Sequence, residues 1–417
     1  MQLRYNYRVY PKPSQRIALA RAFGCARVVY NDGLRARQEA HAAGRPYISD
    51  TDLQKQIITA AKQTPEREWL AEVSSVVLIQ SLRDLHFAYR NFFASVSGKR
   101  KGPKVAAPRF KSRKDSKQSI RLTTNGFSIR PNGRLHVTKV GDLRLKWSRT
   151  LPSAPKSVTI TLDAAGRYWV SFVIQVAPEI LPEAGSDTGI DLGLRHFAVL
   201  ADGTKVDSPR FLRRAEKKLK RLQKALSRKA KGSRNRDKAR KKVARQHARV
   251  ADRRRDFHHK LSTQIIRDNQ AVYAETLAVK GLGRTRLAKS VHDAGWAQFV
   301  NMLEYKARKH GRTFAKVDRA FPSSQVCSAC GHRDGPKSLD VRAWVCPRNS
   351  CRASHDRDHN AAMNILIEGR RIVAAGRAET LIASPSASKT RTHVPAQRVE
   401  AGSHRKGHLA QAGVPGF

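Results

Sequence analysis

The chain has 417 residues, and 40% of them are hydrophobic, which is enough to fill the cores of two or three domains. Lysine and arginine total 82 against 33 aspartates and glutamates, so the formal net charge is +49 and nucleic acid is the expected partner that neutralises it. No apolar run approaches the roughly 18 residues of a membrane-spanning helix, which argues against a membrane protein.

The N-terminus predicts an intracellular protein, because residues 1–10 alternate between apolar and charged side chains and do not resemble a signal peptide. Five cysteines are too few for a disulfide scaffold. Four of them cluster near the C-terminus, which indicates a metal site, whereas Cys25 lies on an apolar helix face and is expected in the core.

The N-terminal half reads as strands around a helical insert. Residues 1–13 begin with a strand, and apolar residues recur at helical spacing over residues 14–97. Alternating patterns return within 98–180, and six or seven short strands would close a small β-barrel. The basic loop before them offers candidate nucleic-acid contacts at Arg109, Phe110, Lys111 and Arg113.

The C-terminal half begins after a linker at 178–186 and alternates strands with helices. Residues 210–260 carry 23 lysines and arginines against 4 acidic residues, in two stretches with thin apolar stripes. We expect two antiparallel helices with basic outer faces, and candidate phosphate contacts at Lys217, Lys220, Arg221 and Lys224. Residues 383–417 lack apolar content and are expected to be disordered.

Three acidic residues are candidates for metal-dependent catalysis. Asp191 lies on an apolar strand flanked by glycines, Glu275 closes the apolar strand 271–276, and Asp358 precedes a short helix. Each could equally be a turn, a strand end or a helix cap. Their order along the chain is that of an RNase H-like fold, in which the first and fourth strands are neighbours. Gathered carboxylates would bind Mg²⁺ or Mn²⁺ and repel one another without it.

The cysteines form two close pairs separated by 15 residues. This pattern predicts a tetrahedral zinc ribbon with thiolate ligands Cys327, Cys330, Cys346 and Cys351. The second pair has four intervening residues where two are usual, so His332 or His355 remains an alternative ligand.

Four segments resemble the TnpB (OrfB) family of insertion-sequence proteins, relatives of type V CRISPR effectors. The resemblance spans Met1 to about Arg371, and its motifs are GIDLG (189–193), ETLAVKGL (275–282), SSQVCSACGH (323–332) and RDHNAAMNI (357–365). It implies an α+β multidomain fold. The implied parts are a wedge β-barrel (1–13 and 98–180), a helical recognition insert (14–97), a RuvC-like nuclease domain (187–320 and 356–375) and an interrupting zinc ribbon (321–355).

The resemblance also implies an activity. Family members bind a structured guide RNA from the transposon end and cut complementary double-stranded DNA beside a short adjacent motif. It assigns catalysis to Asp191, Glu275 and Asp358, with Asp356 as a near rival for the third carboxylate. The implied cofactors are Mg²⁺ or Mn²⁺, a structural Zn²⁺ and the guide RNA. The implied location is the cytoplasm of a prokaryotic cell, associated with the nucleoid.

Two other functions fit parts of the pattern. A nuclease-inactive RNA-guided DNA-binding regulator would use the same scaffold, but such a protein loses a catalytic carboxylate, and all three candidates are present. A metal-dependent transposase of RNase H type would also carry three carboxylates and would join strands instead of leaving free ends. A basic zinc-bearing structural protein gives no reason for these three acidic residues.

Overall fold

The computed structural model describes residues 1–115, 117–338 and 340–382. The chain divides into two compact units, Met1–Ile372 and a second that begins at Val373. All sheets of the described residues belong to the first unit. The segment expected to be disordered, 383–417, lies outside the described residues.

Eight strands form the framework of the N-terminal half: β1 (Gln2–Val9), β2 (Gln118–Thr123), β3 (Phe127–Ile129), β4 (Leu135–Val137), β5 (Gly141–Leu143), β6 (Leu145–Lys146), β7 (Ser157–Leu162) and β8 (Tyr168–Gln175). They make a five-stranded antiparallel sheet of order β2-β7-β8-β1-β6 and a three-stranded sheet of order β3-β4-β5. Strand β1 pairs with β8 over its full length. Tyr7 and Val9 face the core, as the alternation predicted.

A helical block joins β1 to β2, again as predicted. It consists of α1 (Pro13–Ala42), α2 (Asp50–Gln54), short π and 3-10 segments over 55–72, and α3 (Ser75–Val96). Helix α1 begins shortly after β1, and the Lys12 backbone N–H before it donates to the side-chain oxygen of Gln15. Cys25 is buried on α1 in the core shared by helices and sheet, as expected.

The C-terminal half is a mixed sheet with helices. Its strands are β9 (Asp187–Asp191), β10 (His196–Leu200), β11 (Lys205–Asp207), β12 (Ala271–Glu275) and β13 (Thr313–Val317). The order is β11-β10-β9-β12-β13, and β12 runs parallel to both β9 and β13. Its helices are α4 (Phe211–Ser227), α5 (Arg234–Asp268), α6 (Val279–Leu282), α7 (Ala288–Ala294), α8 (Trp296–His310) and α9 (Arg357–Ile382).

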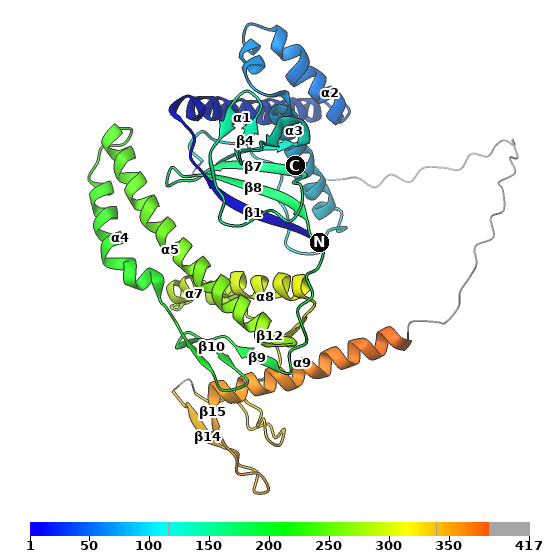
Figure 1. Cartoon of the computed structure of the whole chain (residues 1–417), viewed down its shortest axis with the longest axis vertical. Coiled ribbons are helices and arrows are strands. Elements are labelled where there is room, and N and C mark those ends of the chain that lie inside the picture. Colours follow the sequence, from blue (N-terminus) through cyan, green and yellow to red (C-terminus); the bar gives the residue numbers. More distant parts are fainter. Residues whose placement is uncertain (116, 339, 383–417) are drawn as a thin grey trace, which may run out of the picture. The chain divides into compact units, whose positions relative to one another are not determined.

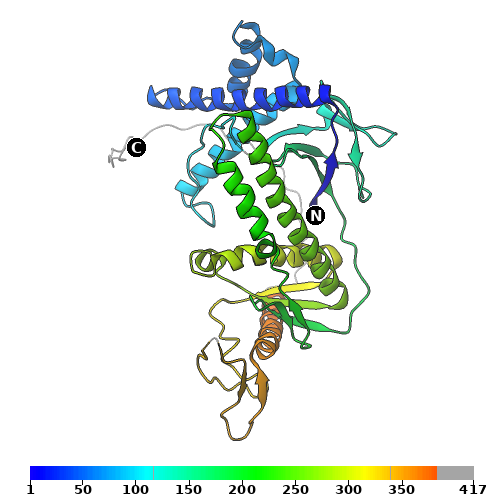
Figure 2. The same cartoon turned by 90° about the vertical axis from the view of Figure 1, so that its left-hand side faces the viewer.

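Helices cover both faces of this sheet (Figure 1 and Figure 2). Ile190 and Val272 pack with Phe299 of α8 in a second hydrophobic core. Since side chains alternate along a strand, Gly189 and Tyr273 lie on the opposite face, where they meet α9. Helix α9 is longer than the short helix expected from the sequence and extends to Ile382.

The basic stretch forms a helical hairpin, as predicted, but its second helix is longer. Helix α5 begins at a Ser233 cap, whose hydroxyl oxygen accepts the Arg236 backbone N–H, and continues eight residues beyond 260 to Asp268. The added turns carry Ile265 and Ile266, which are buried in the core of the mixed sheet. The hairpin is therefore anchored at one end by apolar burial.

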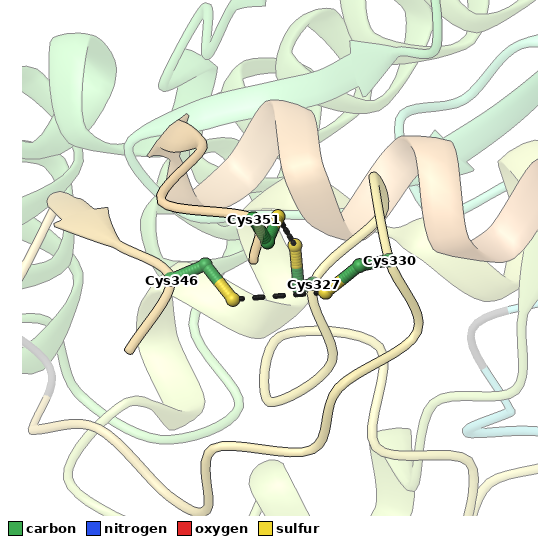
Figure 3. A group of neighbouring side chains, drawn as sticks. All are labelled: Cys327, Cys330, Cys346 and Cys351. Carbon is green, nitrogen blue, oxygen red and sulfur yellow. Dashed lines mark hydrogen bonds between the residues drawn. The ribbon is translucent and has the colours of Figure 1, made fainter. Parts of the chain in front are cut away.

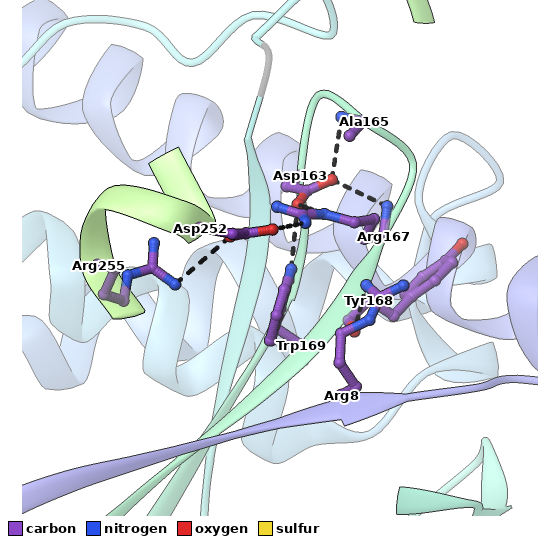
Figure 4. Close-up of polar contacts among 8 residues, drawn as sticks. All are labelled: Arg8, Asp163, Ala165, Arg167, Tyr168, Trp169, Asp252 and Arg255. Carbon is purple, nitrogen blue, oxygen red and sulfur yellow. Dashed lines mark hydrogen bonds and ion pairs between the residues drawn. The ribbon is translucent and has the colours of Figure 1, made fainter. Parts of the chain in front are cut away.

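An ion-pair network connects α5 to the turn between β7 and β8 (Figure 4). The Arg167 guanidinium donates to Asp163 and to Asp252 of α5, at 2.7 and 2.5 Å. Asp163 also accepts the Trp169 indole N–H at 3.0 Å. These contacts hold α5 beside the N-terminal sheet.

A small cysteine-containing segment separates β13 from α9. Its two strands, β14 (Ala343–Val345) and β15 (Ser354–Asp356), pair antiparallel, and β15 leads directly into α9. Across the described ranges, no helix is long and apolar enough to cross a membrane.

Candidate metal and catalytic sites

Asp191 and Glu275 lie side by side at the ends of two parallel strands. Strands β9 and β12 pair in register, with Ile190 opposite Ala274, so the next residue of each strand carries the carboxylate. The Glu275 side chain accepts the Leu192 backbone N–H at 3.0 Å. The prediction that the first and fourth strands of this half are neighbours is confirmed.

The glycine before Asp191 allows α9 to approach the sheet closely. A Cβ atom added to Gly189 would lie 2.2 Å from the Ala362 carbonyl oxygen and 2.5 Å from the Leu366 nitrogen. Asp191 follows Gly189 by two residues, and Glu275 follows Tyr273 by two, so both acidic side chains lie on the face that α9 covers. Asp358 lies in the first turn of that helix.

Burial first, and then the carboxylates of Glu275 and Asp358, hold the pKa of Asp191 well above its ordinary value. Arg357 and Arg342 act in the opposite direction. Burial raises the pKa of Glu275 to about 7, although the Leu192 N–H lowers it. The structure thus brings the three predicted carboxylates into one electrostatically coupled group.

Within the described residues, the three carboxylates do not form a compact group of ligand atoms like that of the cysteines. Within the described residues, only the four clustered cysteines place three or more ligand atoms all within 4.8 Å of one another. Two divalent ions can share a group of carboxylates when they lie about 4 Å apart, with each ion about 2.1 Å from its oxygen ligands. The three carboxylates supply the oxygen ligands that divalent ions such as Mg²⁺ prefer.

Asp356, the rival for the third carboxylate, is occupied elsewhere. Its side chain accepts the His359 backbone N–H at 3.0 Å and so caps α9. It also pairs with Lys205 at 2.7 Å. Asp358, by contrast, is one of the charges that raise the pKa of Asp191.

Arg342 is a candidate functional residue that the sequence did not reveal. It precedes β14, and its guanidinium lies 3.4 Å from an Asp358 carboxylate oxygen. Its backbone carbonyl accepts the Arg357 N–H. The cysteine segment therefore delivers a positive charge to the carboxylates. Nothing in the local pattern distinguishes Arg342 from the chain's other arginines, because its position depends on the pairing of β14 with β15.

The four cysteine sulfurs converge (Figure 3). Sγ of Cys327 lies 3.7 Å from Sγ of Cys351, and the same distance separates Cys330 from Cys346. Disulfide sulfurs lie about 2.05 Å apart, so none of these pairs is bonded. Tetrahedral zinc with Zn–S distances of about 2.3 Å requires sulfurs about 3.8 Å apart, which these separations match.

The histidine alternatives lie outside this group. His355 Nε2 is 3.0 Å from Cys327 Sγ, as a partner that orients a ligand would be. The His332 carbonyl accepts the Cys327 backbone N–H. Among the residues that the structure describes, the compact donor group is made of cysteines alone, and it includes Cys351 despite the wider spacing.

The basic loop after the helical insert is exposed but partly tied down. Arg109, Phe110 and Arg113 are exposed, Phe110 by 51%. Lys111 is held differently: both its backbone polar groups bond the Asn31 amide, and its ammonium lies 3.8 Å from the Tyr30 ring centroid. Burial lowers the pKa of Lys111. Lys111 is exposed like its neighbours, but its ammonium already has the Tyr30 ring as a partner.

The hairpin candidates on α4 are all exposed: Lys217, Lys220, Arg221 and Lys224. Only Lys220 of these has a carboxylate partner in the described ion pairs, Glu216 at 3.3 Å. Leu219, between them, is the buried residue of the helix. The hairpin presents free cations on its outer surface.

Three family models match this chain: "Probable transposase" of the OrfB_IS605 group over 171–286, "Cas12f1-like, TNB domain" over 296–365, and "Helix-turn-helix domain" of the same OrfB group over 1–46. In the last range the structure forms β1 and one continuous helix, α1.

Similar proteins cover most of the chain. A Streptomyces pristinaespiralis protein named "Putative RNA-guided DNA endonuclease" is 43% identical over 89% of this chain and 90% of its own length. The similarly named InsQ of Escherichia coli K12 is 30% identical over 89% and 93%. A Cas12f1–sgRNA–target DNA complex matches with a TM-score of 0.51 and 15% identity, covering 84% of this chain and 82% of that one, which shows a shared fold. The chain belongs to the TnpB (OrfB) family.

Proposed function

We propose that this chain is an RNA-guided DNA endonuclease that hydrolyses phosphodiester bonds at Asp191, Glu275 and Asp358. The observation that carries the proposal is the convergence of these carboxylates from two parallel strands and one helix start. Family membership supports it, since relatives that align with 89% of the chain carry this activity in their names.

The finer architecture is part of the proposal. The two N-terminal sheets would make the wedge β-barrel around the insert at 14–97, and the mixed sheet with its helices would be the RuvC-like domain of RNase H type. With this assignment, the barrel, the insert, the nuclease domain and the zinc ribbon would have the boundaries expected from the sequence. The parallel β9–β12 pair with a covering α9 supports it, as does the location of the cysteine segment between β13 and α9.

The metal assignments rest on the donor chemistry. Oxygen ligands of the three carboxylates suit Mg²⁺ or Mn²⁺, and the thiolates of Cys327, Cys330, Cys346 and Cys351 suit a structural Zn²⁺. When bound, two divalent ions supply an activated water and stabilise the departing 3′ oxygen of an in-line displacement. The protein's own groups position the ions and bring the Arg342 charge to the edge of the cluster.

The partners would be a structured guide RNA from the transposon end and double-stranded target DNA. A net charge of +49 with an exposed basic hairpin supplies the backbone affinity. Base pairing would then read the sequence, while the protein grips backbones and reads a short duplex motif. Such a nuclease would act in the prokaryotic cytoplasm, associated with the nucleoid.

The test begins with the chain expressed together with its flanking transposon-end sequence. RNA that copurifies is sequenced, and a duplex matching its guide portion is incubated with the complex and Mg²⁺. We expect cleavage that requires the RNA, the metal and the match. A duplex with a scrambled target is the control.

Cleavage that persists after the RNA is removed, or that ignores the mismatch, would contradict the guided mechanism. Product ends separate the remaining alternatives. Joined strands would indicate a transposase, and bound but uncut DNA would indicate a regulator.

A further inference from the structure

An exposed aromatic cluster occupies one surface of the helical insert. Tyr47 lies in the segment between α1 and α2, while Tyr89 and Phe93 lie on α3. The Tyr89 and Phe93 rings stack at 5.7 Å with an interplanar angle of 25°, and Tyr47 meets both edge to face. Tyr47 and Phe93 are each about half exposed. Rings so close together but open to water suggest a binding surface.

The buried side chain of Arg37 contacts two of these rings. The Arg37 guanidinium lies 4.3 Å from the Tyr47 ring centroid and 5.5 Å from that of Tyr89. Its Nη2 donates to the Ile48 carbonyl and to Asp50. Its Nη1 is buried and has no hydrogen-bond partner among the described residues. The rings are therefore held in place before any ligand arrives.

The cluster lines an open pocket of about 630 Å³ whose lining also includes cationic residues. Val96 adds apolar surface to the rings, and Arg90 and Lys99 are the exposed cations of the lining. Asp50, the carboxylate behind the rings, is already paired with Arg37 and His86. None of the described residues that line the pocket is acidic.

We propose that this pocket binds an unpaired nucleotide of the RNA that the protein carries, with its base stacked on Tyr47 or Phe93 and its phosphates near Arg90 and Lys99. The inference rests on the proposed function, which supplies an RNA. Unpaired bases in RNA loops and ends stack on aromatic side chains, and cations beside them hold the backbone.

The chemistry of the pocket favours RNA over the other occupants. A second copy of this chain would bring two cation-lined pockets together, which costs free energy at a net charge of +49 per chain. The Tyr47 and Tyr89 hydroxyls make no hydrogen bond within the described part of the chain, so they are available to a 2′-hydroxyl, which DNA lacks.

Photo-crosslinking of the intact complex tests the proposal. Cells that express the full chain with its flanking element are fed 4-thiouridine, which labels RNA, or 5-bromodeoxyuridine, which labels DNA. The purified complex is irradiated and digested with trypsin. We expect RNA adducts on peptide 91–99, which contains Phe93, or on peptide 38–55, which contains Tyr47.

Substitutions make the test quantitative. Phe93→Ala should lower the adduct yield on peptide 38–55 by roughly tenfold, because base stacking on one ring contributes about 1–3 kcal/mol. Phe93→Trp should preserve that yield. Tyr10→Ala is the matched control, since Tyr10 is also half exposed beside an arginine but lies outside the pocket, and it should change nothing.

Three outcomes would overturn the proposal. RNA adducts on α4 and α5 without any on these two peptides would refute the pocket while leaving the proposed function intact. Adducts to bromodeoxyuridine alone would assign the pocket to DNA. A dimer in sedimentation that Phe93→Ala dissociates would assign it to a second copy. If no RNA copurifies at all, the proposed function fails as well.

Discussion

The cysteine cluster and the carboxylate cluster are neighbours that are built in opposite ways. The cysteines come from one short stretch, 327–351, and their sulfurs already lie at distances suited to zinc. The carboxylates come from strands and a helix that are far apart in sequence, and they repel one another. The local fold of one segment thus places the cysteines for zinc binding. The carboxylates, in contrast, are held together by the sheet and α9 although their negative charges repel one another.

The largest effect on cleavage is expected from a substitution in the carboxylate cluster. Asp191→Ala should lower cleavage of a matched duplex by at least about a thousandfold, because metal ligation supplies several kcal/mol of transition-state stabilisation. RNA binding should be unchanged. The control is Asp207→Ala, whose side chain is 95% exposed at the edge of the same sheet. Equal loss in both variants would remove the distinction between them.

At the cysteine cluster, loss of a ligand should change the local fold. Cys346→Ser should abolish stoichiometric zinc and make residues 318–356 sensitive to protease, because a structural zinc site contributes folding free energy directly. Zinc content measured by mass spectrometry, together with limited proteolysis, reports both. Cys25→Ala, at the remaining cysteine, should keep the zinc. A zinc-bound Cys346→Ser protein would return His355 to the ligand set.

Glu275→Gln tests how the buried carboxylate affects the pH dependence of folding stability. The folded pKa of Glu275, about 7, exceeds its ordinary value of 4.5, so the folded state binds more protons between these values and loses stability as pH rises through that window. Without magnesium, the variant should therefore be more stable than the parent at pH 8, by about 1–3 kcal/mol, and similar at pH 4. Denaturant titrations at both pH values measure this. A variant less stable than the parent at pH 8 would contradict the burial of a charged Glu275 carboxylate in the folded state.

Substitution of Arg342 tests whether the cysteine segment contributes to cleavage at the carboxylates. Arg342→Ala should lower cleavage by roughly 10- to 100-fold, since a cation beside developing negative charge is worth a few kcal/mol. Zinc content and RNA binding should stay constant. Arg348→Ala, an exposed arginine of the same segment, is the comparison. Identical rates for the two variants would make the Asp358 interaction incidental.

The smallest effect is expected far from both sites. Replacing Lys217, Arg221 and Lys224 together by alanine should reduce the salt dependence of RNA or DNA binding, by about 0.7 to 0.9 in logarithmic slope for each phosphate that the hairpin no longer neutralises. Affinity measured at several salt concentrations reports the slope. An unchanged slope would show that the hairpin does not bind phosphates.

Much of this arrangement could be predicted, and the exceptions have physical reasons. Alternation and helical spacing predicted β1, the insert and the hairpin, and cysteine spacing predicted the sulfur cluster, because these patterns are local. The length of α9 was underestimated, since the helix continues past its buried residues. Arg342 could not be found, because only strand pairing in the cysteine segment brings it to Asp358. The resemblance assigned the third carboxylate to Asp358, with Asp356 as a near rival, and the capping of α9 by Asp356 favours the same choice.

Manganese binding to the RNA-loaded protein tests the central claim most directly. Electron paramagnetic resonance can count bound Mn²⁺ and detect coupling between two nearby ions. We predict a coupled pair in the parent protein, abolished in Asp191→Ala and kept in Asp207→Ala. Unaltered coupling in Asp191→Ala, or no bound manganese in the parent, would contradict a shared metal site at these carboxylates.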